Sequence, residues 1–194
     1  NYSMPALPAS DAVQVGIVKG AYCWRPRQDV GDAIELLASG SLMQQAILAA
    51  DQLRKLGYAP AIWSVTSYIE LAREAEACER QARLNPTQSR QQPYVESLFG
   101  DLQCPIIAVT DYQKGLPASI SRWMPPSYTV LGTDGFGVSE SRPDLRDHFE
   151  VSVDHIVQAA LVQLYRLGLV GEQELREQLE PLGIDPGKLD PVSR

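Results

Sequence analysis

The fold is decided by the stretch Val130-Leu131-Gly132-Thr133-Asp134-Gly135-Phe136-Gly137-Val138-Ser139-Glu140-Ser141-Arg142. The segment that leads into it, residues 128–131, is short and contains β-branched and aromatic residues, which predicts a buried strand. The glycines allow backbone conformations that a Cβ would forbid. Ser139 or Ser141 can then cap a helix, with Asp144 in its first turn and Pro143 tolerated there. A strand, a tight turn and a helix start are thus expected at the carboxyl edge of an open α/β sheet, where binding sites usually lie.

The glycine spacing alone leaves two interpretations open. The order Gly132-x-x-Gly135-x-Gly137 differs from the Gly-x-Gly-x-x-Gly pattern that holds dinucleotide phosphates. Phosphate binding and a turn that needs positive φ both explain these glycines. We expect Gly135 or Gly137 to take positive φ. We expect Phe136 to plug the sheet edge, and Asp134 to accept backbone N–H bonds or to cap the helix.

The composition indicates a globular protein of ordinary character. The chain has 194 residues, 44% of them hydrophobic and 21% charged, which favours one domain. The net charge of −7 disfavours nucleic-acid binding, which needs clustered Lys and Arg. No apolar run approaches about 18 residues, so no membrane span is expected.

Few residues suggest catalysis or metal binding. Cys23, Cys78 and Cys104 form no Cys-x-x-Cys pair, so we expect buried free thiols in a reducing cytoplasm. The only histidines, His148 and His155, lack metal-ligand spacing and are expected in surface or capping roles. No catalytic residue and no metal ligand is therefore predicted.

Apolar strand-like runs alternate with helical periodicities along the chain, which indicates a three-layer α/β sandwich with a mainly parallel sheet. Strands are expected at residues 13–24, 33–38, 59–65, 104–110 and 128–131, the first at a sheet edge. Helices are expected at residues 42–56, 68–83, 93–99, 115–124, 153–167 and 172–179. Ser39 or Ser41 is the expected cap of the first helix, and Ser152 that of the 153–167 helix.

The beginning of the chain differs from the rest. Residues 1–12 contain Pro and Ser and lack periodicity, which predicts a linker from an upstream domain. Residues 13–194 are then expected to form one domain. Because the chain begins with Asn1 rather than methionine, we expect it to be part of a longer polypeptide.

The glycine stretch, with Arg142 and Phe149-Glu150-Val151 behind it, resembles the C-terminal domain of transketolase-like enzymes. The branch it resembles is that of the homodimeric pyruvate dehydrogenase first component. Further segments agree in the same order from about residue 1 to about residue 190. They are Asn1-Tyr2-x-Met4-Pro5-Ala6, Lys19-Gly20-x-Tyr22, Ser64-Val65-Thr66-Ser67, Glu70-Leu71-Ala72-Arg73, Cys78-Glu79-Arg80, Pro93-Tyr94 and Thr110-Asp111-Tyr112.

The resemblance implies a five-stranded, mostly parallel sheet with one antiparallel edge strand. It also implies a parent enzyme that uses thiamine diphosphate and magnesium, held through Gly-Asp-Gly and Asn-Asn motifs. This chain has neither motif, and its only asparagines are Asn1 and Asn85. The resemblance implies that the cofactor lies between the N-terminal and middle domains of the parent and not on this chain, and the missing motifs agree with this. The implied role of the chain is to support the dimer and to border the active site.

The implied parent decarboxylates pyruvate and passes the acetyl group to a lipoyl group. The implied partners are the N-terminal and middle domains, a second copy in a homodimer, and an acetyltransferase component with its lipoyl domain, in the cytoplasm. Two alternatives stay open: the same domain of another transketolase-like enzyme, and a free-standing α/β module that binds an anion. The residues of a structural motif or possible anion or interface site are Gly132, Asp134, Gly135, Phe136, Gly137, Ser139 and Arg142.

Overall fold

Five strands form one sheet in the computed structural model, which describes residues 6–28 and 30–193. The strands are β1 (Ala21–Arg25), β2 (Ala33–Ala38), β3 (Ala59–Val65), β4 (Ile106–Val109) and β5 (Tyr128–Leu131). Their order in the sheet is β1-β3-β2-β4-β5. The β1–β3 pair is antiparallel and the other three pairs are parallel. The expected mostly parallel sheet with one antiparallel edge strand is therefore confirmed.

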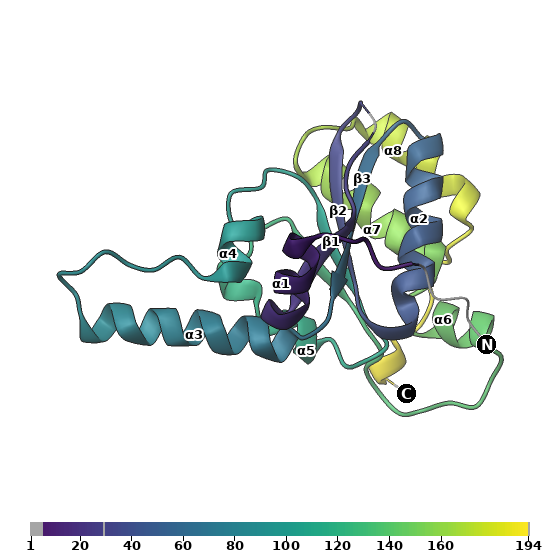
Figure 1. Cartoon of the computed structure of the whole chain (residues 1–194). Helices are drawn as coiled ribbons and strands as arrows, with labels where there is room; N and C mark the ends of the chain where they lie inside the picture. The colour runs from purple at the N-terminus through teal and green to yellow at the C-terminus, as the bar shows by residue number, and fades with distance from the viewer. Residues whose placement is uncertain (1–5, 29, 194) are drawn as a thin grey trace.

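Helices cover both faces of this sheet (Figure 1). One face carries α2 (Met43–Lys55), α7 (Val153–Arg166) and α8 (Glu172–Leu179), and the other carries α1 (Asp11–Lys19), α3 (Tyr68–Leu84), α4 (Tyr94–Phe99) and α5 (Gly115–Ala118). Successive side chains of a strand point to opposite faces, so Leu36 joins the core under α2 and α7 while Leu37 joins the core under α3 and α4. This double burial explains why β2 reads as a nearly continuous apolar run.

One further helix and four 3-10 turns are the remaining elements of the described residues. Helix α6 (Arg142–His148) lies between β5 and α7, at the carboxyl end of the sheet. The 3-10 turns are η1 (Gly40–Leu42), η2 (Ser121–Trp123), η3 (Glu180–Leu182) and η4 (Pro191–Ser193). Within the described residues, no helix has both the length and the apolar character needed to cross a bilayer.

The expected strand at residues 13–24 is wrong in its first half, which forms α1. Ser10 caps this helix by accepting the Val13 N–H, at 3.2 Å. Gly20 ends it with a φ of 107°. The alternation that suggested a strand came from Val15 and Ile17, which are exposed on the helix. Of the linker expected at residues 1–12, residues 1–5 lie outside the described part and residues 11–12 begin α1.

The helix expected at residues 115–124 is broken into α5 and η2. After α5 the N–H groups of Ser119 and Ile120 bond three residues back, to Leu116 and Pro117, instead of four, so the α-helical pattern ends after one turn. Gly115 lowers the helical propensity of this segment. The chain therefore forms two single turns instead of one continuous helix.

The prediction that β5 is a buried strand is also wrong, because all four of its residues are only half-buried. It pairs with β4 alone and forms the second edge of the sheet. The helix after the glycine turn is confirmed, and Ser141 rather than Ser139 is its cap. Ser152 caps α7 as expected.

Candidate functional site

The direction in which the chain adds strands to the sheet changes between β2 and β4. From β2 the chain passes through α2 to β3 on one side, whereas from β4 it passes through α5 to β5 on the other. Helices α2 and α5 lie on opposite faces of the sheet (Figure 1). The loops after β2 and β4 therefore diverge, and a crevice opens between them, which is where open α/β sheets bind their ligands.

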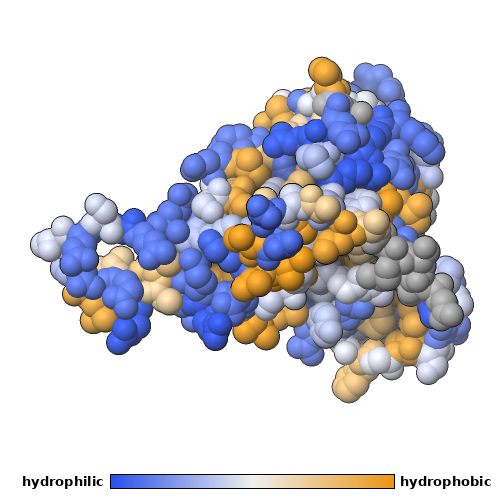
Figure 2. All heavy atoms as spheres, in the orientation of Figure 1, coloured by the Kyte–Doolittle hydropathy of each residue, from blue (hydrophilic) through white to orange (hydrophobic). Residues whose placement is uncertain are grey.

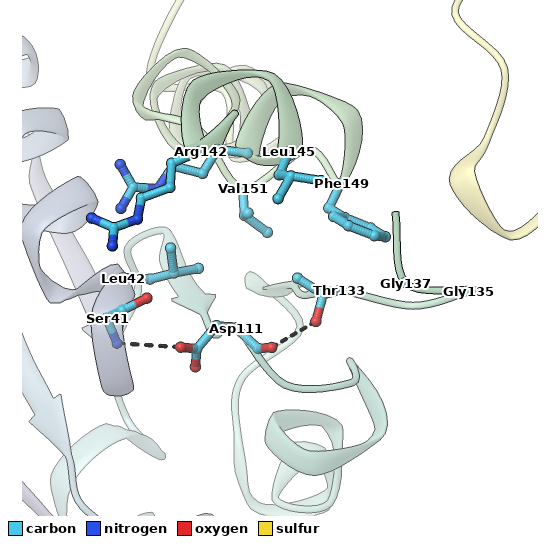
Figure 3. Close-up of a pocket in the computed structure, with 11 residues that line it drawn as sticks. Ser41, Leu42, Asp111, Thr133, Gly135, Gly137, Arg142, Leu145, Phe149 and Val151 are labelled. Carbon is cyan, nitrogen blue, oxygen red and sulfur yellow. Dashed lines mark hydrogen bonds between the residues drawn. The ribbon is translucent and has the colours of Figure 1, made fainter. Parts of the chain in front are cut away.

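Side-chain hydrogen bonds hold the three neighbouring strand ends together at this crevice. The Ser39 hydroxyl donates to Thr110 Oγ1 at 2.8 Å. The Ser41 N–H donates to Asp111 Oδ2 at 3.4 Å, and the Thr133 hydroxyl donates to the Asp111 carbonyl at 2.7 Å (Figure 3). The expectation that Ser39 or Ser41 caps α2 by its side chain is therefore wrong. The Ser39 hydroxyl serves instead to fix β2 to β4.

The glycine turn after β5 has the backbone that was predicted for it. Gly135 takes a φ of 98°, and a Cβ at this position would lie 3.0 Å from the Pro191 carbonyl oxygen. Gly132 needs its missing side chain for a different reason, because a Cβ there would lie 2.8 Å from the Tyr112 carbonyl. Asp134 Oδ1 accepts the Lys114 N–H at 2.9 Å, so its expected role as a backbone acceptor is confirmed.

Phe136 does not plug the sheet edge as expected, since 84% of its surface is exposed. The positive φ at Gly135 turns the following residues away from β5. Phe136 and Val138 therefore project from the loop as exposed apolar side chains.

A pocket of about 640 Å³ lies between this crevice and α6. In Figure 3, Leu145 extends from α6, and Phe149 and Val151 from the residues that follow it, toward Ser41, Asp111 and Thr133. The lining residues are Ser41, Leu42, Asp111, Thr133, Gly135, Gly137, Arg142, Leu145, Arg146, Phe149 and Val151. The structure thus brings three of the predicted site residues, Gly135, Gly137 and Arg142, to one cavity. Gly132, Asp134, Phe136 and Ser139 are not part of its lining.

The charges in the pocket are unequal. Arg142 and Arg146 both line it and are one helical turn apart on α6, whereas Asp111 is the one carboxylate among its lining residues. A guanidinium matches the planar oxygens of a carboxylate or a phosphate. Sequence reasoning missed Arg146 and gave Asp111 no role. A spacing of four on a predicted helix, which places two residues on one face, was the signal that could have identified the arginine pair.

Neither histidine lines this pocket. His155 is buried, with 4% of its surface exposed, so the expected surface role is wrong. Its Nδ1 lies 2.8 Å from the Ser152 hydroxyl, which also caps α7, and its Nε2 has no hydrogen-bond partner among the described residues. Burial lowers the pKa of His155, and Lys188 adds to this effect. His148 packs edge-on against Phe149, with 4.8 Å between the ring centroids.

Cys23, Cys78 and Cys104 are free thiols as expected, but the expectation that all three are buried is wrong, because Cys23 is only half-buried. Burial raises the pKa of Cys23 and of Cys104 to about 11, which makes them poor nucleophiles at neutral pH. Within residues 6–28 and 30–193, no group of three or more His, Cys, Asp or Glu side chains is arranged to hold a metal ion.

Glu35 on β2 is a buried charged residue that the sequence pattern did not single out. Its carboxylate accepts the Trp63 indole N–H at 2.6 Å and pairs with Arg27 at 3.1 Å. Burial raises the pKa of this carboxyl. The donors around Glu35 satisfy its oxygens, so we interpret it as a structural link between β2 and β3.

Comparison with known proteins identifies similar sequences and folds. A family model described as the transketolase-like TK C-terminal domain matches residues 20–152. The pyruvate dehydrogenase E1 component of Pseudomonas aeruginosa is 40% identical over 195 residues, which cover 99% of this chain and 22% of that protein. The corresponding protein of Escherichia coli K12 is 37% identical over 193 residues, covering 98% of this chain and 21% of that protein.

Solved structures show the same fold at lower identity. A transketolase from Pichia stipitis matches with a TM-score of 0.56 and 22% identity, over 85% of this chain and 20% of that one. Transketolase from Campylobacter jejuni matches with a TM-score of 0.52 and 21% identity, over 82% of this chain and 20% of that one. The chain therefore spans about a fifth of the length of the curated relatives it matches.

Proposed function

Because the chain belongs to the transketolase-like C-terminal domain family, we propose that it forms the C-terminal domain of a pyruvate dehydrogenase first component. The observation that carries this proposal is the 40% identity to the Pseudomonas aeruginosa E1 component across 99% of the chain. The transketolase structures are only 21–22% identical and support the fold alone. In the proposed parent, pyruvate is decarboxylated and the acetyl group passes to the lipoyl group of an acetyltransferase component in the cytoplasm.

Thiamine diphosphate and magnesium would supply the chemistry of that parent, and the residues that line the carboxyl-edge pocket of the described chain do not fit them. Magnesium takes oxygen ligands in near-octahedral geometry, from carboxylates together with substrate phosphates. The pocket at the carboxyl edge offers one carboxylate, Asp111, beside two arginines, and Asp111 already accepts the Ser41 N–H. We therefore assign the cofactor to the N-terminal and middle domains, and assign no catalytic side chain to this domain.

The proposed contribution of this domain is to support the dimer and to border the active site. Two groups of exposed apolar side chains favour such contacts. Val15, Ile17 and Val18 lie on the outer side of α1, where apolar atoms gather in Figure 2. Phe136 and Val138 project from the glycine loop. Apolar surface of this kind is typical of a domain that packs against other parts of an assembly.

A domain exchange tests the proposal against its main alternative. This chain would replace the matching region of the Escherichia coli E1 component in one chimera, and that of Campylobacter jejuni transketolase in another. We expect the first chimera to form a folded dimer that releases CO₂ from pyruvate with thiamine diphosphate and magnesium. We expect the second to lose its ketol-transfer activity.

Two outcomes would contradict the proposal. One is a folded, dimeric E1 chimera that releases no CO₂, and the other is an active transketolase chimera beside an inactive E1 chimera. Melting curves and sedimentation of both chimeras establish that each is folded and dimeric before its activity is compared.

A further inference from the structure

We propose that the pocket between α6 and the carboxyl ends of β2 and β4 binds a small organic anion. The ligand class is a carboxylate or phosphate group attached to an apolar body. This inference goes beyond the proposed function, because it concerns a pocket formed within this chain. The test of this inference needs no catalytic activity, so the inference and the proposed function can fail separately.

The charge of the pocket identifies the anionic part of the ligand. The whole chain carries a net charge of −7, yet Arg142 and Arg146 both line a single cavity. Figure 3 shows the Arg142 side chain extending along the pocket toward the side of Ser41 and Leu42. Paired guanidinium groups favour carboxylates and phosphates, because each can donate two parallel hydrogen bonds to one oxyanion.

The rest of the wall identifies the apolar part. Leu42, Leu145, Phe149 and Val151 line the same cavity, and Figure 3 places Leu145, Phe149 and Val151 together on the α6 side. The volume of about 640 Å³ falls within the range of small-molecule pockets, about 300–1,000 Å³. An inorganic ion alone would leave this apolar wall unused.

The position of the pocket supports a binding role. It lies where the loops after β2 and β4 diverge, which is the general location of ligand sites in open α/β sheets. The hydrogen bonds from Ser41 and Thr133 to Asp111 hold these loops in place. The wall facing α6 is therefore already formed, and little ordering is needed when a ligand enters.

Titration calorimetry on the 194-residue chain tests the ligand class with four matched probes. Phenyl phosphate and benzoate carry both an anion and an apolar ring, inorganic phosphate carries only the anion, and benzyl alcohol carries only the ring. We expect the first two to bind with a Kd of roughly 1 mM or tighter. We expect the last two to bind at least about tenfold more weakly.

The order of phenyl phosphate and benzoate then shows which anion the pocket prefers. The proposal is overturned if neither shows saturable binding up to about 10 mM. It is also overturned if inorganic phosphate matches phenyl phosphate, or if benzyl alcohol matches benzoate, because one of the two recognition elements would then be absent.

Three variants locate the binding. Arg142→Gln and Arg146→Gln should each weaken phenyl phosphate binding roughly tenfold. The control is Arg166→Gln, which removes the same charge at the exposed end of α7 and should change the affinity by less than about twofold. Melting curves check that all three fold. Unchanged affinity in both pocket variants would place the ligand elsewhere and overturn the proposal.

Asp111→Asn gives a test of opposite sign. Asp111 lines the same pocket as the arginines and repels an anion, so the isosteric amide should raise the affinity for phenyl phosphate by roughly twofold or more. Melting curves check that the variant keeps the stability of the unmodified chain, because the Asp111 carboxylate also accepts the Ser41 N–H. A loss of affinity in an equally stable variant would contradict recognition of an anion at this wall.

Discussion

The backbone at Gly135 shows how one residue shapes the candidate site. Its φ of 98° lies in a region that residues with a Cβ rarely adopt, and its Cα faces the Pro191 carbonyl. Gly137, two residues later, is not among the positive-φ glycines, and a Cβ there would meet no heavy atom within 4 Å. The backbone therefore requires glycine at position 135 but not at position 137.

Gly135→Ala should lower the free energy of unfolding by at least about 1 kcal/mol. The matched control Gly137→Ala should change it by less than about 0.5 kcal/mol. Urea unfolding followed by circular dichroism measures both. In the E1 chimera, Gly135→Ala should reduce stability more than turnover per folded molecule. An unchanged melting temperature with lost turnover would show that the turn acts directly in function.

His155 predicts a pH dependence of stability at the scale of a single side chain. Burial, followed by Lys188, lowers the pKa of His155 in the folded state, while Asp147, Glu150 and Asp154 act in the opposite direction. In the unfolded chain, the His155 imidazole takes up a proton near about pH 6.5. In the folded chain it takes up this proton only at lower pH. The unfolded state therefore holds more protons in this window, and the free energy of unfolding should fall as the pH drops below about 6.5.

Urea unfolding between about pH 5.5 and pH 8 measures this fall. His155→Gln removes the titrating group and should flatten the profile in that window. His148→Gln keeps His155 and should retain the fall. A profile that is the same in His155→Gln and in the unmodified chain would contradict the assignment.

At the scale of elements, the strands with two buried faces were predictable because their apolar runs are unambiguous. The expected bounds of β2 and β3 agree with the structure, and each pairs with strands on both sides. The first strand failed because exposed apolar residues on α1 imitate the alternation of a strand. The pocket was only partly predictable, since Leu42, Asp111 and Leu145 come together through the sheet order, which the local pattern does not contain.

The cap of α7 gives a prediction for one element. Ser152 accepts the His155 N–H at 3.5 Å, and its hydroxyl lies 2.8 Å from His155 Nδ1. Ser152→Ala should lower the free energy of unfolding by about 1 kcal/mol. Ser41→Ala is the control, because Ser41 makes its bond to Asp111 through the backbone N–H. Urea unfolding of the two variants measures the difference, and equal stabilities would contradict the capping role.

At the scale of the whole molecule, the structure is a sheet covered by helices, with a pocket at its carboxyl edge and exposed apolar side chains at its surface. We predict that the isolated chain does not bind thiamine diphosphate with magnesium at micromolar affinity. The lining of its carboxyl-edge pocket has one carboxylate where magnesium prefers several oxygens. Calorimetry with thiamine diphosphate and magnesium measures this, with the E1 chimera as the positive control. Micromolar binding to the isolated chain would contradict the prediction.

The exposed face of α1 predicts how the whole molecule behaves in solution. Val18 is 78% exposed and Val15 is 51% exposed on that helix, and burying such surface against a second copy is favourable. We expect the isolated chain to self-associate, through an interface that buries at least about 1,000 Å² in total if it is specific. Sedimentation velocity over a range of concentrations measures the association.

Val18→Glu should shift the chain toward the monomer, because a carboxylate on this face must lose its hydration when the interface forms. Leu84→Glu is the matched control. Leu84 is 58% exposed at the end of α3, which extends away from α1 (Figure 1). The control should associate like the unmodified chain. A strict monomer at high concentration, or equal association of the Val18→Glu variant and the unmodified chain, would show that α1 does not form the contact.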